Sequence, residues 1–137
     1  MAKIKTEKVA SENKTAKHIL VIDDDPTLTT MVESRLKANG YSAVSANDAA
    51  IGLETAIKDI PDLIILDVMM PIINGYNMCT LLKSEQRTKK IPIVMLTSRA
   101  EEQDKAIGRE VGVDAYLTKP FKMEELLKTI EDLLRPK

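Results

Sequence analysis

Short apolar runs alternate along the chain with longer segments in which apolar residues recur at helical spacing. The short runs, rich in β-branched residues, lie at 18–23, 41–46, 62–67, 91–96 and 114–118. The segments with helical spacing lie at about 26–39, 48–59, 75–86, 100–111 and 123–135. Strands that alternate with helices in this way build a parallel sheet with helices on both faces. The pattern therefore predicts a doubly wound α/β fold with a five-stranded parallel sheet.

The apolar runs differ in how continuous they are. Residues 18–23, 62–67 and 91–96 are almost uninterrupted apolar sequences, which is typical of parallel strands that are buried on both faces. Residues 41–46, with the sequence YSAVSA, are more polar. We therefore expect the strand at 41–46 to lie at an edge of the sheet.

Polar residues indicate where the helices begin and end. Asp25 precedes Pro26, and a capping residue followed by proline favours a helix start. The Asn-Gly pair at 39–40 is typical of the end of that helix. Asn47 is expected to cap the second helix, and Asn74 immediately precedes the third.

A chain of 137 residues is long enough for one domain with a core of its own. We assign this domain to residues 18–135. Residues 1–17 hold five lysines, two glutamates and few apolar residues, a composition typical of a disordered segment. This basic tail is either a tether that contacts a partner or a solvated leader.

Composition narrows the classes of function. The 20 basic and 21 acidic residues give a net charge of −1, so neither nucleic acid nor a membrane surface is an expected partner. The single cysteine, Cys79, excludes an internal disulfide. No apolar stretch is long enough to span a bilayer or to form the core of a signal peptide. We therefore expect a cytoplasmic protein.

Polar residues suited to chemistry follow four of the five predicted strands. They are Asp23 and Asp24 at the end of the first strand, Asp67 at the end of the third, Thr97 at the end of the fourth and Lys119 just after the fifth. The carboxyl ends of parallel strands meet at one edge of the sheet, where ligands bind. Gathering three carboxylates there is costly unless a cation shares their charge. The sequence therefore predicts a divalent-cation site, and Mg²⁺, which takes oxygen ligands, fits it best.

Asp67 is the best candidate for a reactive group. Aspartate carboxylates form acyl-phosphates, and a transferring phosphoryl group needs positioning and charge neutralisation more than covalent help. The ammonium group of Lys119 can supply positive charge to a phosphate oxygen. Thr97 can donate its hydroxyl group and Ser98 its backbone N–H. Helix capping explains Asp25, but it does not explain carboxylates at the ends of two buried strands.

Four segments together carry a family resemblance: VIDDD, LDVMMPIING, IVMLTS and YLTKPF. In this order and spacing they resemble the receiver domain of two-component response regulators, over residues 18–135. The resemblance implies a (βα)5 flavodoxin-like receiver fold. It also implies that Asp67 accepts a phosphoryl group from a phosphohistidine on a histidine kinase or a histidine phosphotransfer protein. Such a domain is not an enzyme in the usual sense, because it only takes up and loses its own phosphoryl group.

The resemblance implies a set of metal ligands as well. Asp23 and Asp24 would hold Mg²⁺, or Mn²⁺ in its place, and Asp67 and the backbone carbonyl of Met69 would complete the set. The side chain of Met69 has no strong hydrogen-bonding group that could orient an attacking water. We therefore expect the phosphorylated form to hydrolyse slowly.

Further residues are assigned by resemblance to binding the phosphoryl group and to a switch. Thr97 and Lys119 would hold the phosphoryl group, and Ser98 would add a backbone contact. On phosphorylation, Thr97 would move toward the phosphate and Tyr116 would turn inward behind it. This change would reposition the surface at 100–135, which a downstream partner protein would contact.

Two other interpretations fit parts of the sequence. Asp23, Asp25 and Thr27 form the Asp-x-Asp-x-Thr pattern of Mg²⁺-dependent phosphatases of the haloacid-dehalogenase type. That interpretation lacks an acidic motif after Lys119 and leaves Asp67 without a role. A receiver fold that serves only as a binding scaffold predicts the loss of an acidic residue or of the lysine, but all of them are present.

The sequence leaves open whether the chain works alone. A stand-alone receiver, as in chemotaxis, motility or phosphorelay systems, is the simplest interpretation, because the last predicted helix ends close to Lys137. A receiver cut from a longer regulator is the alternative.

Overall fold

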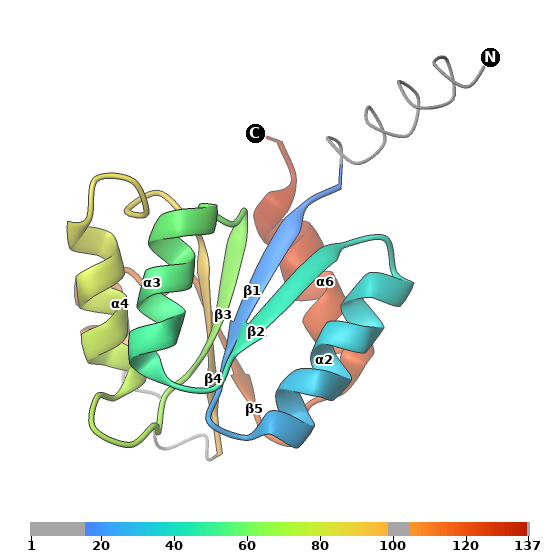
Figure 1. The fold of residues 1–137 in the computed structure, drawn as a ribbon, viewed down its shortest axis with the longest axis horizontal. Coiled ribbons are helices and arrows are strands. Elements are labelled where there is room, and N and C mark those ends of the chain that lie inside the picture. The colour runs from blue at the N-terminus through green and yellow to red at the C-terminus, as the bar shows by residue number, and fades with distance from the viewer. Residues whose placement is uncertain (1–15, 99–104, 137) are drawn as a thin grey trace.

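The computed structural model describes residues 16–98 and 105–136. Five parallel strands form one sheet in the order β2-β1-β3-β4-β5, and this sheet runs through the middle of the molecule (Figure 1). The strands are β1 (His18–Ile22), β2 (Ser42–Ala46), β3 (Leu63–Asp67), β4 (Ile93–Thr97) and β5 (Ala115–Thr118). The helices are α2 (Pro26–Ala38), α3 (Ala49–Asp59), α4 (Gly75–Ser84), α5 (Lys105–Val111) and α6 (Met123–Leu134).

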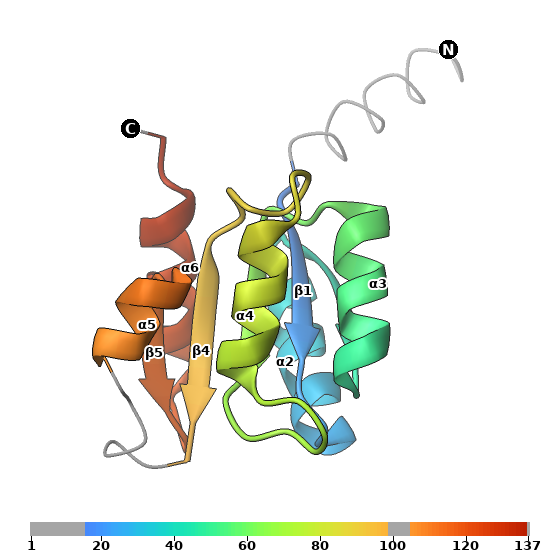
Figure 2. The same cartoon turned by 90° about the vertical axis from the view of Figure 1, so that its left-hand side faces the viewer.

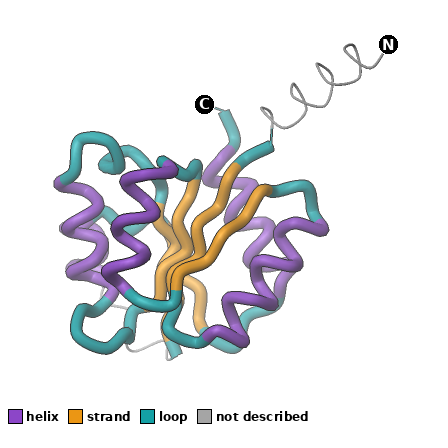
Figure 3. The backbone as a smooth tube through the Cα atoms, viewed as in Figure 1, coloured by secondary structure: helices purple, strands orange, loops and turns teal. Residues whose placement is uncertain are grey.

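The helices cover the sheet in two layers. Helices α2 and α6 contact each other on one face, while α3 contacts α4 and α4 contacts α5 on the other. The turned view in Figure 2 shows α4 in front of the sheet, between α3 and α5. Figure 3 shows the strands in orange between the two sets of purple helices. This is the doubly wound α/β fold that the alternating pattern predicts.

Strand side chains alternate between two apolar cores, one under each layer of helices. On β1, Leu20 and Ile22 belong to the core under α3 and α4, while Ile19 and Val21 belong to the core under α2 and α6. All four side chains are fully buried, and each such burial stabilises the fold by about 1.5–3 kcal/mol. Strand β2 lies at the edge of the sheet, as predicted, with Ser42 exposed.

One predicted helix cap is wrong. Asp48, not Asn47, caps α3, because its carboxylate accepts a hydrogen bond from the backbone N–H of Ile51. The amide group of Asn47 instead donates to the carbonyl oxygen of Asp23 and to the hydroxyl group of Thr29, both at 2.9 Å. Asn47 therefore ties the end of β2 to the end of β1, and the next residue is left to cap the helix.

The other predicted boundaries are within a few residues of the observed ones. Asp25 caps α2, and Asn74 caps α4 by accepting from the backbone N–H of Asn77. Strand β4 begins at Ile93, after Pro92, rather than at residue 91. Of the helix predicted at 100–111, residues 105–111 form α5, and residues 99–104 lie outside the described residues.

Residues 1–15 of the predicted tail also lie outside the described residues. Within the part of the chain that the structure describes, no helix is long and apolar enough to cross a membrane.

Candidate functional site

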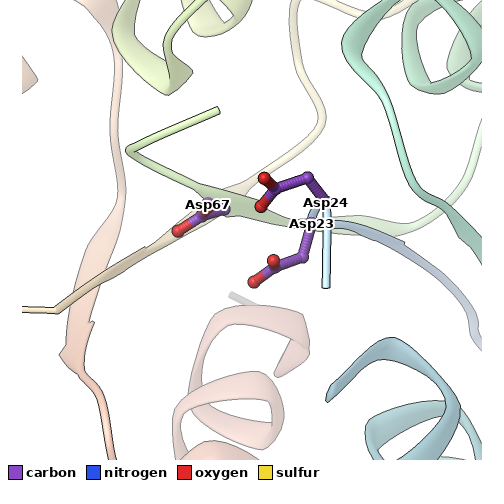
Figure 4. A group of neighbouring side chains, drawn as sticks. All are labelled: Asp23, Asp24 and Asp67. Carbon is purple, nitrogen blue, oxygen red and sulfur yellow. The ribbon is translucent and has the colours of Figure 1, made fainter. Parts of the chain in front are cut away.

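Three carboxylates meet at the carboxyl edge of the sheet. Asp67 is the last residue of β3, and Asp23 and Asp24 directly follow β1, which pairs with β3. Each residue offers a carboxylate oxygen, and these oxygens lie within 4.8 Å of one another. Figure 4 shows the three side chains gathered at these strand ends. Asp23 is 0% exposed and Asp67 is 4% exposed, whereas Asp24 is exposed.

Asp23 is held by several hydrogen bonds. One of its carboxylate oxygens accepts from the backbone N–H of Asp25 at 3.0 Å, and the other accepts from the ammonium group of Lys119 at 2.8 Å. Its backbone carbonyl accepts from Asn47, and its backbone N–H donates to the carbonyl of Ala46. The ends of β1, β2 and β5 are thereby joined around one buried carboxylate.

Lys119 brings a positive charge to the carboxylates from the end of β5. Its Nζ also donates to Oδ1 of Asp67 at 3.2 Å, so one ammonium group bridges two carboxylates. Its backbone N–H donates to the carbonyl of Thr97 at 2.6 Å, and the peptide bond to Pro120 is cis. The two side-chain hydrogen bonds place the lysine ammonium group at the ends of β3 and β1.

Among the described residues, one ammonium group lies beside this group of three carboxylates, so negative charge exceeds positive charge there. Burial raises the pKa of Asp67 to about 6, and the negative charge of Asp23 adds to this shift. The positive charge of Lys119 acts in the opposite direction but does not cancel it. Burial alone would lower the pKa of Lys119, but its hydrogen bond to Asp23 and the two carboxylate charges raise it above its ordinary value.

This chemistry fits a hard divalent cation. Mg²⁺ takes oxygen ligands and commonly uses one or two carboxylates together with waters and phosphate oxygens. The described residues offer oxygens from Asp23, Asp24 and Asp67, close enough together to share one ion. The pKa of Asp67 is raised first by burial and then by the negative charge of Asp23, and a bound cation would offset that negative charge.

The remaining candidates lie around the same edge, at different depths. Thr97 is fully buried at the end of β4, and Ser98 is exposed one residue later. The side chain of Met69 is 61% exposed in the loop after β3. Asp25, which the phosphatase interpretation needs, accepts hydrogen bonds from the first backbone N–H groups of α2 instead.

Tyr116 lies deeper in β5 and contacts a residue that the sequence analysis did not single out. Its hydroxyl oxygen lies 3.0 Å from the hydroxyl oxygen of Tyr76 on α4. Neither helical spacing nor motif matching could indicate this pair, because the two residues are 40 positions apart. The hydrogen bond from Asn47 to the backbone carbonyl of Asp23 was also missed. An asparagine between a predicted strand and a predicted helix is also a typical helix cap, so the sequence favoured that role.

A protein-family model described as the response regulator receiver domain matches residues 19–131. The chain belongs to this family. This receiver domain is 44% identical over 117 residues to the DNA-binding dual master transcriptional regulator RpaA of Synechocystis sp., in a match that covers 85% of this chain and 48% of that protein. The chain spans about half the length of the curated relatives it matches.

Solved structures confirm the flavodoxin-like receiver fold. The chemotaxis protein CheY4 of Vibrio cholerae matches the receiver domain with a TM-score of 0.83 and 34% identity, covering 88% of this chain and 100% of that one. The receiver domain of a sensor histidine kinase from Pseudomonas aeruginosa matches with a TM-score of 0.79 and 27% identity, covering 88% of this chain and 98% of that one. That structure carries a magnesium ion coordinated in its active-site cleft.

Proposed function

We propose that this receiver domain is the phosphoacceptor of a two-component phosphorelay and that Asp67 is the residue that becomes phosphorylated. The observation that carries the proposal is the setting of Asp67. Its carboxylate is almost fully buried, lies 3.2 Å from the ammonium group of Lys119 and shares its surroundings with Asp23. A nucleophile beside a fixed positive charge is what phosphoryl transfer to a carboxylate requires.

In the proposed reaction, a carboxylate oxygen of Asp67 attacks the phosphorus atom of a phosphohistidine. An O–P bond forms as the N–P bond breaks, and the imidazole leaves as a neutral ring that keeps the proton already carried by its other nitrogen. The nucleophile must be ionised, and a carboxyl group with a pKa of about 6 is mostly ionised at neutral pH. The raised pKa of Lys119 keeps its ammonium group charged, so it can contact an oxygen of the bound phosphoryl group. The hydroxyl group of Thr97 and the backbone N–H of Ser98 are the proposed donors to the other oxygens.

The metal site belongs to the same proposal. Asp23, Asp24 and Asp67, with the backbone carbonyl of Met69, would hold Mg²⁺, or Mn²⁺ in its place. When bound, the cation supplies positive charge that offsets the charge of the carboxylates and of the phosphoryl oxygens. With that charge supplied, Lys119 would share the neutralisation of the two carboxylates, and its ammonium group would be able to contact the phosphoryl group.

Phosphorylation would be sensed by other proteins. We propose that the donor is a histidine kinase or a histidine phosphotransfer protein, and that Thr97 and Tyr116 transmit the change to the surface at 100–135. A downstream partner protein would bind there. We further propose that the protein acts in the cytoplasm without direct contact with nucleic acid, and that its chemistry is limited to uptake and loss of its own phosphoryl group. This receiver chemistry is the same for a stand-alone protein and for a part of a longer regulator.

Incubation with acetyl phosphate and Mg²⁺, followed by intact-protein mass spectrometry, tests the proposal. We expect one phosphoryl group on the wild-type chain, none on Asp67→Asn and none on the wild type when Mg²⁺ is chelated. Equal uptake by Asp67→Asn, or no uptake by the wild type from acyl-phosphate and phosphoramidate donors, would contradict the proposal.

A further inference from the structure

Two tyrosine hydroxyl groups meet between α4 and β5. Tyr76 lies in the first turn of α4 and Tyr116 in β5, and their hydroxyl oxygens are 3.0 Å apart. Both side chains are partly buried and pack against the same apolar core. Figure 2 shows α4 in front of the sheet and α5 over β5. The hydrogen bond therefore joins a helix on the face of the sheet to its edge strand.

The hydroxyl group of Tyr116 reaches α5 at Gly108. A Cβ atom built on Gly108 would fall on the hydroxyl oxygen of Tyr116 and would lie 3.0 Å from its Cζ. Gly108 is buried, and its carbonyl accepts hydrogen bonds from the backbone N–H groups of Gly112 and Val113 at the end of α5. The missing side chain at position 108 therefore provides the space for the Tyr116 hydroxyl group.

The first turn of α4 is also fixed to the strand end that carries Asp67. Gly75 precedes Tyr76, and its backbone N–H donates to the carbonyl of Val68 at 2.7 Å. A Cβ atom on Gly75 would lie only 2.5 Å from the backbone oxygen of Asp67. The turn therefore lies directly against the backbone of Asp67, and Tyr76 extends from this turn to Tyr116.

We propose that Tyr76 is a positioning residue that links the phosphoacceptor to the α5–β5 surface by holding the Tyr116 hydroxyl group at Gly108 in the unphosphorylated protein. The inference rests on the proposed function of Asp67. If phosphorylation turns the Tyr116 side chain, it does so against the Tyr76–Tyr116 hydrogen bond. Loss of the Tyr76 hydroxyl group therefore favours the turned arrangement, by roughly two- to tenfold in the population ratio, which is the effect of one net hydrogen bond.

Fluorine NMR of protein labelled with 3-fluorotyrosine tests this link. The chain has three tyrosines, so Tyr→Phe variants assign each signal. In unphosphorylated Tyr76→Phe, we expect the Tyr116 signal to move toward its position in the phosphorylated wild type. The size of this shift should correspond to roughly a two- to tenfold change in the population ratio of the two Tyr116 arrangements. Tyr41→Phe is the matched control, because Tyr41 packs against the other core, and it should leave the Tyr116 signal unchanged.

Gly108→Ala provides a second variant that displaces the Tyr116 hydroxyl group, and alanine favours a helix over glycine. It should move the Tyr116 signal in the same direction, and adding Tyr76→Phe to it should have little further effect. A Tyr116 signal that is the same in Tyr76→Phe and wild type overturns the link. A Tyr116 signal that does not change on phosphorylation, although mass spectrometry shows the adduct, also overturns the link. In that case the proposed function stands. No adduct in the wild type overturns the proposed function, and the link to Asp67 with it.

Discussion

Asp23 and Asp67 are almost fully buried side by side, and the ammonium group of Lys119 is shared between them. Asp24, the third carboxylate, is exposed, so water screens its charge more effectively. The pKa of Asp67 rises to about 6 because of burial and the charge of Asp23.

Removing the charge of Asp67 should stabilise the metal-free fold. We expect Asp67→Asn to raise the free energy of unfolding at pH 7 by on the order of 1 kcal/mol, because it removes a buried charge and the repulsion from Asp23. The amide oxygen can still accept from Lys119. Asp24→Asn is the matched variant and should stabilise the protein less. Urea unfolding in the presence of a chelator measures both changes, and an Asp67→Asn protein less stable than the wild type would contradict this account.

The stability of the metal-free protein should depend on pH through the same carboxyl group. The pKa of Asp67 is raised from 3.8 to about 6 in the folded state, so the folded state binds the proton more tightly than the unfolded state. Tighter proton binding by the folded state stabilises the fold, and this stabilisation is fully present below about pH 4. It decreases as the pH rises toward 6, and above that pH the free energy of unfolding no longer changes through this group. The slope of this decrease stays below the limit of about 1.4 kcal/mol per pH unit that a difference of one bound proton would give. The difference in unfolding free energy between wild type and Asp67→Asn, measured from pH 4 to 8, should follow this curve, and a difference independent of pH would contradict it.

Met69 lies close to Asp67 in sequence and is 61% exposed, so it can be replaced with little risk to the core. Asparagine at this position could hold a water molecule near the phosphoryl group. We expect Met69→Asn to shorten the half-life of the phosphorylated protein by roughly two- to tenfold, the effect of one hydrogen bond on a barrier. Timed mass spectrometry after removal of the donor measures the half-life. A longer half-life in Met69→Asn would contradict the expectation.

At the scale of elements, the loop from β3 into α4 is held close to the acceptor strand by Gly75. Any side chain there would meet the backbone of Asp67 and the sulfur of Met95, at 2.5 and 2.9 Å. Glycine is therefore required at position 75 for α4 to lie this close to the end of β3, although alanine is intrinsically the better helix former by about 1 kcal/mol.

Gly75→Ala should consequently destabilise the fold. We expect a loss of about 1–3 kcal/mol, typical of overpacking, and slower phosphorylation, because α4 must move away from the strand end. Thr80→Ala, at an exposed position of the same helix, should change stability much less. Chemical unfolding and timed phosphate uptake measure the two effects, and a Gly75→Ala protein as stable as the wild type would show that α4 is not closely packed there.

Local pattern was enough to predict the elements and their caps where one interpretation dominates. The Asp25-Pro26 start and the polar edge strand at 41–46 are examples. Local pattern predicted the wrong cap at Asn47 and Asp48, because both residues can cap a helix and only the proximity of Asp23 to Asn47 decides between them. It could not indicate the Tyr76–Tyr116 pair, since that contact depends on how α4 packs beside β5.

At the scale of the whole molecule, the two apolar cores are built from residues between Ile19 and Leu134. Residues 1–17 hold few apolar residues, so their composition predicts that they add little to these cores. We expect removal of residues 1–15 to leave the melting temperature and the phosphorylation of Asp67 unchanged, as measured by calorimetry and mass spectrometry. A large drop in melting temperature would show that the tail contributes to the stability of the domain.

The strand order also explains why one edge of the sheet can collect the reactive groups. Strands β1, β3, β4 and β5 are neighbours in turn, so residues separated by up to 96 positions become hydrogen-bonding partners. The position of these residues at the carboxyl ends of predicted parallel strands predicted this convergence. The uneven burial of the three carboxylates, which determines the pKa of Asp67, could be seen only in the folded chain.

The central claim is that the phosphoryl group is attached to the side chain of Asp67. Borohydride reduces an acyl-phosphate to an alcohol, so treatment of the phosphorylated protein followed by peptide mass spectrometry locates the modified residue. We predict homoserine at position 67 after treatment with acetyl phosphate and Mg²⁺, and unchanged aspartate at positions 23 and 24. Homoserine at either of those positions, or at none of the three, would contradict the account.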